Sequence, residues 1–346
     1  MMNEMKKVTV VIPNLNGRKY LEGCLSSLRE QSFRAFDTIL LDNGSSDGSV
    51  EYVRKNFPEV KVRAYRENTG FCHAVNDGIL LSKTPFVLLL NNDTAFGPDL
   101  LKNLLSAMER GGEKVFSCCA KLVSMKEPDK LDDAGDFVCA LGWAFARGKG
   151  RDSSLYVREE ECFACCAAAA LYRRSILEEI GLFDEKHFAY LEDIDIGWRA
   201  RTRGYVNLFV PKAIVFHAGS ATSGSRYNDF KVRQAAGNSL YTIYKNMPLW
   251  QLVLNAPGIL SGILVKGLYF AKKGFGKAYV AGLLRGIRLT ATADAGQGPE
   301  ISPSLQHRME KADFPESTGR RAAPGTLLRI QAELFRSLFL LLQSWR

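Results

Sequence analysis

Two acidic segments, about a hundred residues apart, contain the side chains best suited to chemistry. Asn91-Asn92-Asp93 directly follows Phe86–Leu90, an apolar run typical of a buried strand. Residues 192–195 place three carboxylates at the start of a predicted helix, where the helix dipole and free backbone N–H groups favour negative charge. One carboxylate can hold a metal ion while another accepts a proton. Together the two segments indicate an enzyme.

The elements that would position these acids follow from hydrophobic patterning. Apolar runs alternate with amphipathic segments and short connections, which predicts an α/β fold with a Rossmann-like, mainly parallel sheet flanked by helices. Beyond the fourth helix the pattern loosens, and Lys126–Glu161 gives no clear prediction. The expected strands are Val8–Pro13, Phe36–Asp42, Val60–Tyr65 and Phe86–Leu90, and the expected helices are Tyr20–Gln31, Asp47–Asn56, Gly70–Ser82 and Pro98–Glu109.

Polar residues follow three of these strands, at 13–17, 42–48 and 91–94. In open α/β sheets the carboxyl ends of the strands form the crevice that binds ligands. Asp42 could accept hydrogen bonds there from a base or a ribose. Neither a Gly-x-Gly-x-x-Gly motif nor a Walker sequence is found in the chain, so phosphate must be neutralised in another way. A divalent cation on Asp93, Mg²⁺ or Mn²⁺, suits a site with carboxylate and phosphate oxygens.

The net charge of +9 is concentrated in the last third of the chain. Residues 231–346 contain 16 Lys and Arg against 6 Asp and Glu. Such a basic region can meet nucleic acid or an anionic membrane. The apolar composition of Leu249–Phe275 favours the membrane and argues against nucleic acid. Polar residues interrupt this run, so it predicts an interfacial amphipathic helix rather than a full span. The alternative is a helix packed on its own domain or on a partner in a homodimer.

These patterns divide the chain into four segments. Residues 1–246 are expected to form the α/β domain, and 247–290 a basic, amphipathic, helical segment that associates with membranes. Residues 291–325, rich in Ala, Gly, Pro and Ser, are expected to be a flexible linker, and 326–346 a C-terminal amphipathic helix. The residues after Met1 do not have the pattern of a secretory signal, so the eight cysteines are interpreted as reduced, cytosolic thiols. Their spacing offers half of a zinc ligand set, and small buried cysteines are the preferred interpretation.

Taken together, the motifs resemble the family 2 inverting glycosyltransferases of the GT-A fold, in particular the rhamnosyltransferase-like branch. The resemblance covers roughly Val8–Asn246. It depends on the order and spacing of several motifs, each of which is weak alone. They are Val11-Ile12-Pro13-Asn14-Leu15-Asn16, Asp42-Asn43-Gly44-Ser45-Ser46-Asp47-Gly48, Asn68-Thr69-Gly70-Phe71, Asn91-Asn92-Asp93, Gly181-Leu182-Phe183-Asp184-Glu185 and Glu192-Asp193.

The resemblance implies roles for individual residues. Asp193 corresponds to the catalytic base, and Glu192 is the second catalytic candidate, which would orient the acceptor. Asp93 corresponds to the last residue of the DxD-type motif that binds the metal, and His217 to an imidazole ligand. Asp42 corresponds to the contact with the nucleotide base. The residues expected to bind the nucleotide-sugar are Pro13, Asn16, Asp42, Asn68, Gly70, Asn92, Arg226 and Arg233.

Some residues depart from the family pattern or have another interpretation. Asn91 stands where a strict DxD motif has aspartate, which leaves Asp93 as the carboxylate ligand. Arg226 and Arg233 would approach the donor diphosphate, but they equally fit a solvated basic helix face. Asp195, within the same acidic segment, is expected to cap the helix that follows.

The resemblance also implies a function. The chain would be a metal-dependent inverting glycosyltransferase of surface polysaccharide synthesis, cytoplasmic and peripheral on the inner face of the cell membrane. Its donor would be a dTDP- or UDP-sugar, with dTDP-rhamnose as the first expectation, and its acceptor a lipid-linked saccharide or other glycan. A sugar nucleotidyltransferase would need a Gly-rich basic loop after the first strand, where this chain has only Asn16-Gly17-Arg18-Lys19. Intact Asp93 and Asp193 argue against a noncatalytic binding module.

Overall fold

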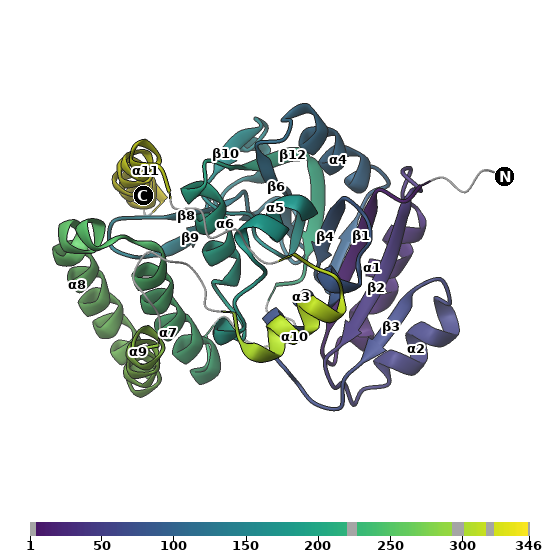
Figure 1. Cartoon of the computed structure of the whole chain (residues 1–346), viewed down its shortest axis with the longest axis horizontal. Coiled ribbons are helices and arrows are strands. Elements are labelled where there is room, and N and C mark those ends of the chain that lie inside the picture. Colours follow the sequence, from purple (N-terminus) through teal and green to yellow (C-terminus); the bar gives the residue numbers. More distant parts are fainter. Residues whose placement is uncertain (1–4, 220–226, 293–300, 316–321, 345–346) are drawn as a thin grey trace.

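The structure is a computed structural model that describes residues 5–219, 227–292, 301–315 and 322–344. Its centre is a mixed sheet with strand order β10-β12-β6-β11-β4-β1-β2-β3 (Figure 1). Strands β4, β1, β2 and β3 run parallel, and β11 is antiparallel to both β4 and β6. The strands are β1 (Val8–Asn14), β2 (Phe36–Asp42), β3 (Lys61–Ala64), β4 (Phe86–Leu90), β6 (Val115–Ser124), β10 (Glu160–Cys162), β11 (Ala169–Arg173) and β12 (Val206–His217).

Four shorter strands complete the framework around the site. β5 (Thr94–Phe96) pairs with β12, β7 (Leu131–Asp133) pairs with β6, and β8 (Asp136–Val138) pairs with β9 (Ala144–Ala146). Three of them lie in the segment for which the sequence gives no clear prediction. These strands are too short to show the alternation on which such predictions depend.

Helices cover both faces of the sheet. Within β4, Val87 and Leu89 face one apolar core while Leu88 and Leu90 face the other, as expected for a sheet buried on both sides. The covering helices are α1 (Arg18–Arg29), α2 (Ser49–Asn56), α3 (Phe71–Leu81), α4 (Leu100–Arg110), α5 (Arg174–Ile180) and α6 (Glu192–Thr202). The predicted α/β class, with its sheet flanked by helices, is confirmed.

The C-terminal helices gather at the end of the molecule opposite β3 (Figure 1). They are α7 (Asp229–Asn246), α8 (Leu249–Lys272), α9 (Gly276–Thr290) and α11 (Pro324–Ser344), whereas α10 (Pro303–Lys311) lies beside α3. Helices α7 and α9 cross closely because glycines stand at the contact. A Cβ on Gly282 would lie 2.5 Å from the Arg233 carbonyl oxygen. The expected C-terminal helix is present as α11.

Helix α10 differs from the expected linker. Leu305 and Met309 are buried in the main core, and Arg308 pairs with Asp77 at 2.5 Å and with Glu185. The polar, Ala- and Pro-rich composition around this helix suggested a linker. Composition does not show that Leu305, and Arg308 and Met309 one helical turn later, meet a complementary surface. The segment 291–325 is therefore not a continuous linker.

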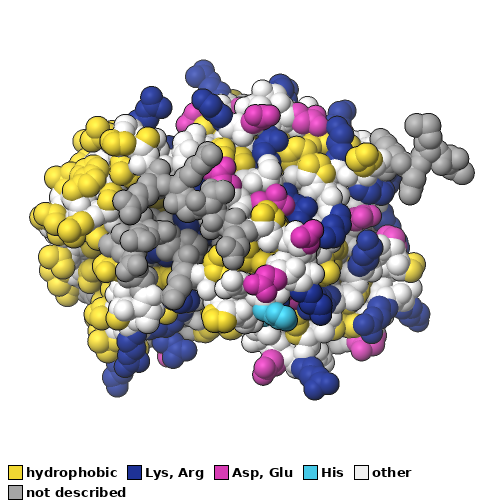
Figure 2. Space-filling view, in the orientation of Figure 1, with side chains coloured by type: hydrophobic (Ala, Val, Ile, Leu, Met, Phe, Trp, Pro, Cys, Tyr) yellow, Lys and Arg dark blue, Asp and Glu magenta, His cyan; other side chains and the backbone are white. Residues whose placement is uncertain are grey.

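Helix α8 leaves most of its apolar surface exposed. Among the described residues it is the single helix whose length and composition would allow it to cross a membrane, with a mean hydropathy of 1.4 over its most apolar window. Only 11% of that window is buried. Figure 2 shows apolar side chains gathered at the end of the molecule where α8 lies in Figure 1.

A buried group of charges joins α6 to α7. The Lys245 Nζ lies 2.7 Å from Asp184 Oδ2 and 2.7 Å from Asp195 Oδ1, and all three side chains are buried. Arg199 pairs with the other oxygen of Asp195 at 3.1 Å. Burial alone would raise the pKa of Asp195, but Lys245 and Arg199 lower it well below its ordinary range. Asp195 is thus part of a buried ion cluster and not a helix cap, which corrects the expectation.

We predict that Lys245→Met destabilises the fold. The substitution leaves Asp184 without a cation and Asp195 with Arg199 alone, and breaking a buried ion pair costs about 3–5 kcal/mol. The free energy of unfolding is measured by urea denaturation followed by circular dichroism. Lys102→Met, at a side chain that is 66% exposed, is the matched control and should change stability by less than about 0.5 kcal/mol. Similar stabilities for the two variants would contradict the prediction.

Candidate active site

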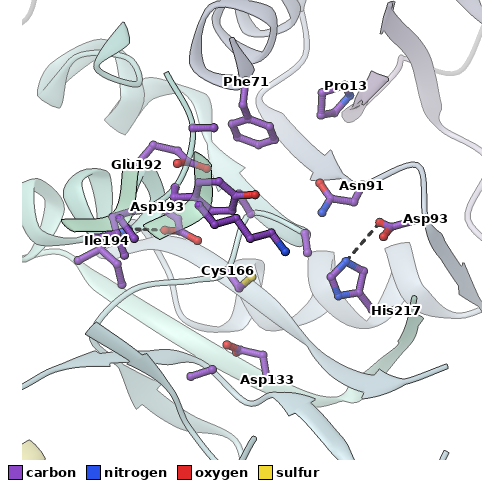
Figure 3. A pocket seen from close by; sticks show the side chains of 18 of the residues that line it. Pro13, Phe71, Asn91, Asp93, Asp133, Cys166, Glu192, Asp193, Ile194 and His217 are labelled. Carbon is purple, nitrogen blue, oxygen red and sulfur yellow. Dashed lines mark hydrogen bonds and ion pairs between the residues drawn. The ribbon is translucent and has the colours of Figure 1, made fainter. Parts of the chain in front are cut away.

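An open cavity of about 1020 Å³ lies where the carboxyl ends of β1 and β4 meet α6. Both acidic segments line it, so the structure brings together residues that are far apart in the chain. Figure 3 shows Asp93 and His217 on one side and Glu192 and Asp193 on the other, with Cys166 between them. The cavity is large enough for a ligand of nucleotide size, since such pockets measure roughly 300–1,000 Å³.

Asp93 and His217 form a pair at one wall of the cavity. The Asp93 Oδ1 lies 3.2 Å from His217 Nε2 (Figure 3). The pairing of β12 with β5 sets this distance, because His217 stands opposite Thr94, the residue after Asp93. Ala218 also donates its backbone N–H to the Asp93 carbonyl at 3.0 Å. The fold therefore brings together the two residues expected to bind the metal, and their role as ligands stays a prediction.

Asp132 holds the opposite side of the His217 ring. The His217 Nδ1 lies 2.8 Å from Asp132 Oδ2, and Lys149 Nζ lies 2.5 Å from Asp132 Oδ1. Burial alone would lower the pKa of His217, but hydrogen bonds to Asp132 and Asp93 raise it to about 9. Burial would raise the pKa of Asp132, but His217 and Lys149 lower it to about 2.

These donors fit a divalent cation. A carboxylate oxygen and an imidazole nitrogen converge on the cavity with 3.2 Å between them. Two adjacent ligands at right angles, each about 2.1 Å from an octahedral ion, would be roughly 3 Å apart. Asn91, which replaces the first aspartate of a DxD motif, lines the same wall. The residues present thus suit Mn²⁺ or Mg²⁺ coordinated by Asp93 and His217 together with ligand oxygens.

The loop before α6 presents the second pair of acids. Its residues Phe188, Tyr190 and Leu191 have positive φ angles of 62°, 73° and 65°, which are costly for residues with side chains. Asn238 on α7 holds this loop by donating to the carbonyl oxygens of residues 187, 189 and 190 at 3.0, 2.9 and 2.7 Å. Arg285 on α9 in turn donates to Asn238 Oδ1 at 2.7 Å. The start of α6 therefore depends on contacts from two C-terminal helices.

Asp193 and Glu192 have raised pKa values. Burial raises the pKa of Asp193, although its carboxylate accepts the backbone N–H of Ile194 at 2.8 Å. Burial and the neighbouring charge of Asp193 raise the pKa of Glu192 to about 8. Glu192 is only 7% exposed, and its Oε2 has no hydrogen-bond partner among the described residues. Asp193 is thus suited to accepting a proton, and Glu192 at neutral pH to donating a hydrogen bond from its carboxylic acid.

The residues expected to bind a nucleotide-sugar divide into two groups. Pro13, Asn68 and Asn92 line the cavity. Asn16, Asp42, Gly70 and Arg233 are not among the cavity-lining side chains, and Arg226 lies outside the described residues. Arg233 is exposed on α7. The cations that line the cavity are Lys149 and Lys231, and burial lowers the pKa of Lys231.

Asp42 is connected to the cavity through other side chains. It is 1% exposed, and its two carboxylate oxygens accept from Asn14 Nδ2 at 2.7 Å and from the backbone N–H of Ser45 at 2.9 Å. Asn14 also accepts from Asn92 Nδ2 at 2.5 Å, and both asparagines line the cavity. The role of Asp42 as a base contact stays a prediction, while its position shows that it orients Asn14.

A second amide network supports Asn68 and Gly70. Asn43 donates to Asn68 Oδ1 at 2.9 Å and to the Gly70 carbonyl at 3.0 Å, and it accepts the backbone N–H of Thr69 at 2.9 Å. Gly70 has a φ of +92°, and a Cβ there would lie 2.6 Å from the Phe188 ring. Glycine at this position thus lets the loop before α6 approach α3.

Sequence patterns missed several cavity residues. Asp132, Asp133, Asp136, Phe145 and Lys149 all come from the segment without a prediction, and their places depend on the short strands β7 to β9. The polar character of the segment was the only available signal, and it does not distinguish a solvated loop from a cavity wall. Asn43 belongs to the motif at 42–48 and Asn238 to none of the motifs, and hydrogen bonds that link distant segments cannot be inferred from spacing.

A family model described as glycosyl transferase family 2 matches residues 9–181, which is half of the chain. The N-acetylglucosaminyl-diphospho-decaprenol L-rhamnosyltransferase of Mycobacterium tuberculosis is 27% identical over 229 residues, covering 59% of this chain and 74% of that relative. An uncharacterised glycosyltransferase of Rickettsia typhi is 22% identical over 284 residues, covering 79% of this chain and 82% of its own length.

Two solved structures share the fold. The mannosyltransferase PcManGT from Pyrobaculum calidifontis, in complex with GDP-Man and Mn2+, has a TM-score of 0.53 at 15% identity and covers 96% of this chain and 86% of its own. GalNAc-T7 with UDP, GalNAc and Mn2+ has a TM-score of 0.58 at 14% identity, and the match covers 91% of this chain and 55% of the GalNAc-T7 chain.

We predict that Asp93→Asn weakens Mn²⁺ binding. The change removes the carboxylate charge but keeps the side-chain volume, and the loss should exceed the roughly 10–100-fold typical of residues that only support a ligand. Free Mn²⁺ is followed by electron paramagnetic resonance during titration of the protein. Asp37→Asn, at a partly exposed aspartate paired with Lys61, is the control. Equal affinity of wild type and Asp93→Asn would remove Asp93 from the metal site.

Proposed function

The chain belongs to glycosyl transferase family 2 and is a glycosyltransferase, and from this premise we propose a metal-dependent, inverting transfer of sugar from a nucleotide donor to a hydroxyl group. The observation that carries the proposal is the meeting of Asp193 with Asp93 and His217 in one cavity. Structures of the same fold with nucleotides, sugars and Mn2+ support the cofactor and the class of donor.

The acid on α6 performs the proton transfer. The acceptor hydroxyl attacks the anomeric carbon on the face opposite the leaving nucleoside diphosphate, and Asp193 takes its proton as the new bond forms. The raised pKa of Asp193 makes it a better base than an ordinary aspartate. Glu192 donates a hydrogen bond that orients the acceptor. A single displacement inverts the anomeric configuration.

The opposite wall stabilises the leaving group. Asp93 and His217 would hold the cation, whose charge would offset the negative charge that develops on the departing phosphate. Lys149 and Lys231 add positive charge to the same cavity. Pro13, Asn68 and Asn92 line the part that receives the nucleotide-sugar. Asp42 supports this part through Asn14, and Gly70 supports it by allowing the close approach of Phe188.

The donor is a dTDP- or UDP-sugar, with dTDP-rhamnose as the first candidate, and the acceptor is a lipid-linked saccharide of a surface polysaccharide. The support is the similarity to the mycobacterial rhamnosyltransferase, whose name gives N-acetylglucosaminyl-diphospho-decaprenol as its acceptor. Because many sugars are transferred on this scaffold, the sugar must be identified by assay.

The assay measures nucleoside diphosphate release from a panel of UDP-, dTDP- and GDP-sugars with Mn²⁺, Mg²⁺ or EDTA. We predict metal-dependent release from one donor and a decrease of about 10²–10⁴-fold in Asp193→Asn, which removes the base. Donor affinity, measured by calorimetry, should stay within about threefold because the substitution keeps the shape of the cavity.

Two results would contradict this function. Near wild-type turnover in Asp193→Asn would remove Asp193 as the base. Tight nucleotide binding without turnover, with glycan acceptors supplied, would favour a binding module instead. Asp195→Asn is not a suitable control because it disturbs the buried ion cluster, whereas Asp129→Asn changes a side chain that is 69% exposed.

We also propose that the protein is cytoplasmic and attaches to the inner face of the membrane through α8. Leu260, Leu264 and Leu268 recur at helical spacing and are 66%, 63% and 65% exposed. Lys272 and Lys273 follow at the end of the helix and can contact anionic lipid headgroups. A lipid-linked acceptor would be reached from this position.

We predict that replacing Leu260, Leu264 and Leu268 with serine reduces binding to anionic vesicles by about 100-fold, if each leucine contributes roughly 1 kcal/mol. Binding is measured by vesicle sedimentation. Truncation is unsuitable because Leu305 and Leu334 belong to the main core. The control replaces Leu81, Leu155 and Val157, which are exposed elsewhere. The wild type could instead form a dimer and fail to bind vesicles. If that dimer dissociates in the α8 variant, the exposed face of α8 is a dimer contact.

A further inference from the structure

We propose that Asp132 is a positioning residue, which fixes the orientation and tautomer of His217 so that His217 Nε2 faces the cation site at Asp93. The inference rests on the metal-dependent function proposed above and adds a residue that belongs to neither acidic motif. Asp132 is placed on the opposite side of the imidazole from Asp93, so it acts through His217.

The backbone places Asp132 for this task. Strand β6 lies between β7 and β12, and its end is paired with both. On β12, His217 stands opposite Ser124 of β6. On β7, Leu131 pairs with Val123 and Asp133 with Leu122, so Asp132 is the additional residue of a bulge. Bulges redirect a side chain and are over-represented next to active sites. Here the bulge turns Asp132 toward the histidine on the other side of β6.

The hydrogen bond determines which ring nitrogen is available. An ionised carboxylate only accepts hydrogen bonds, so the 2.8 Å contact requires a proton on His217 Nδ1. In the neutral ring the lone pair then belongs to Nε2, which lies 3.2 Å from Asp93 Oδ1. A cation needs that lone pair. Carboxylates that accept from metal-binding histidines fix the tautomer in this way.

Lys149 keeps the carboxylate in place. Its Nζ contacts Asp132 Oδ1, while Oδ2 faces the ring, so each oxygen has one partner. The Asp132 side chain is 17% exposed and that of His217 is 12% exposed, which limits competition from water. The four groups form a row in which the carboxylates of Asp93 and Asp132 alternate with the nitrogen groups of His217 and Lys149. Without Asp132, the ring could rotate and place its proton on either nitrogen.

The test titrates Mn²⁺ and Ca²⁺, each alone, into the full chain. Asp132→Ala should weaken Mn²⁺ binding by about 10–100-fold, the range found when a supporting partner of a metal ligand is removed. The effect on Ca²⁺ should be smaller, because Ca²⁺ prefers oxygen ligands and depends less on the imidazole. A general loosening of the site would weaken both ions alike, so an unchanged ratio of the two affinities would overturn the proposal.

Two further variants make the test decisive. Asp132→Asn keeps an oxygen that can accept a hydrogen bond from His217 Nδ1, so its Mn²⁺ affinity should stay within about threefold of wild type. This variant also tests the proposal if Asp132→Ala fails to fold. Because Asp132 acts through His217, Asp132→Ala should have no further effect in a His217→Ala background. Additive losses, or wild-type affinity in Asp132→Ala, would refute the positioning role.

Asp129→Ala, a neighbouring aspartate that is 69% exposed, is the matched control and should bind Mn²⁺ as the wild type does. The control variants also separate this inference from the function. If Asp93→Asn and His217→Ala abolish Mn²⁺ binding while Asp132→Ala does not, the metal site stands and the positioning role fails. If His217→Ala leaves Mn²⁺ affinity unchanged, the metal site with His217 fails, and the role of Asp132 fails with it.

Discussion

The buried contact between Lys245 and the carboxylates of Asp184 and Asp195 is the constraint on which the geometry of the site depends. Lys245 belongs to α7, Asp195 to α6, and Asp184 to the segment that leads into the loop before α6. A buried charge without a partner costs several kcal/mol, so these elements can move apart only at great cost. The helix that begins with Glu192 and Asp193 is thereby held against the C-terminal helices.

The acids of the cavity have pKa values that are shifted in opposite directions. Asp132 stands between His217 and Lys149, and these partners lower its pKa to about 2. For Asp193 and Glu192, burial is the largest cause and raises the pKa values. Acids in one cavity therefore differ in their tendency to bind a proton or a cation. This difference supports the proposed division of the cavity into a metal-binding wall and a proton-accepting wall.

The C-terminal helices hold the loop before Asp193 in place and also form an exposed apolar surface. Asn238 and Arg285 hold the loop before Asp193 in backbone conformations that are unfavourable by themselves. Helices α10 and α11 fill the main core through Leu305 and Leu334. The same region exposes the apolar side chains of α8. The region with the basic excess is thus part of the catalytic body, and its outer face remains available for contact with lipid or protein.

Local patterns were sufficient for much of this protein. Hydrophobic runs and turn residues predicted the first four strands and their helices to within a few residues, because both are properties of short stretches of chain. The order of motifs predicted the family, and it selected Asp93, His217 and the acids of α6, which the structure places in one cavity. By contrast, the tertiary structure alone decided the places of Asp132, Lys149 and Asn238, the burial of Asp195 and the docking of α10. Each of these depends on contacts between distant residues, such as the bulge of β7 against β6 and the reach of Lys245 between two helices, which no spacing along the chain encodes.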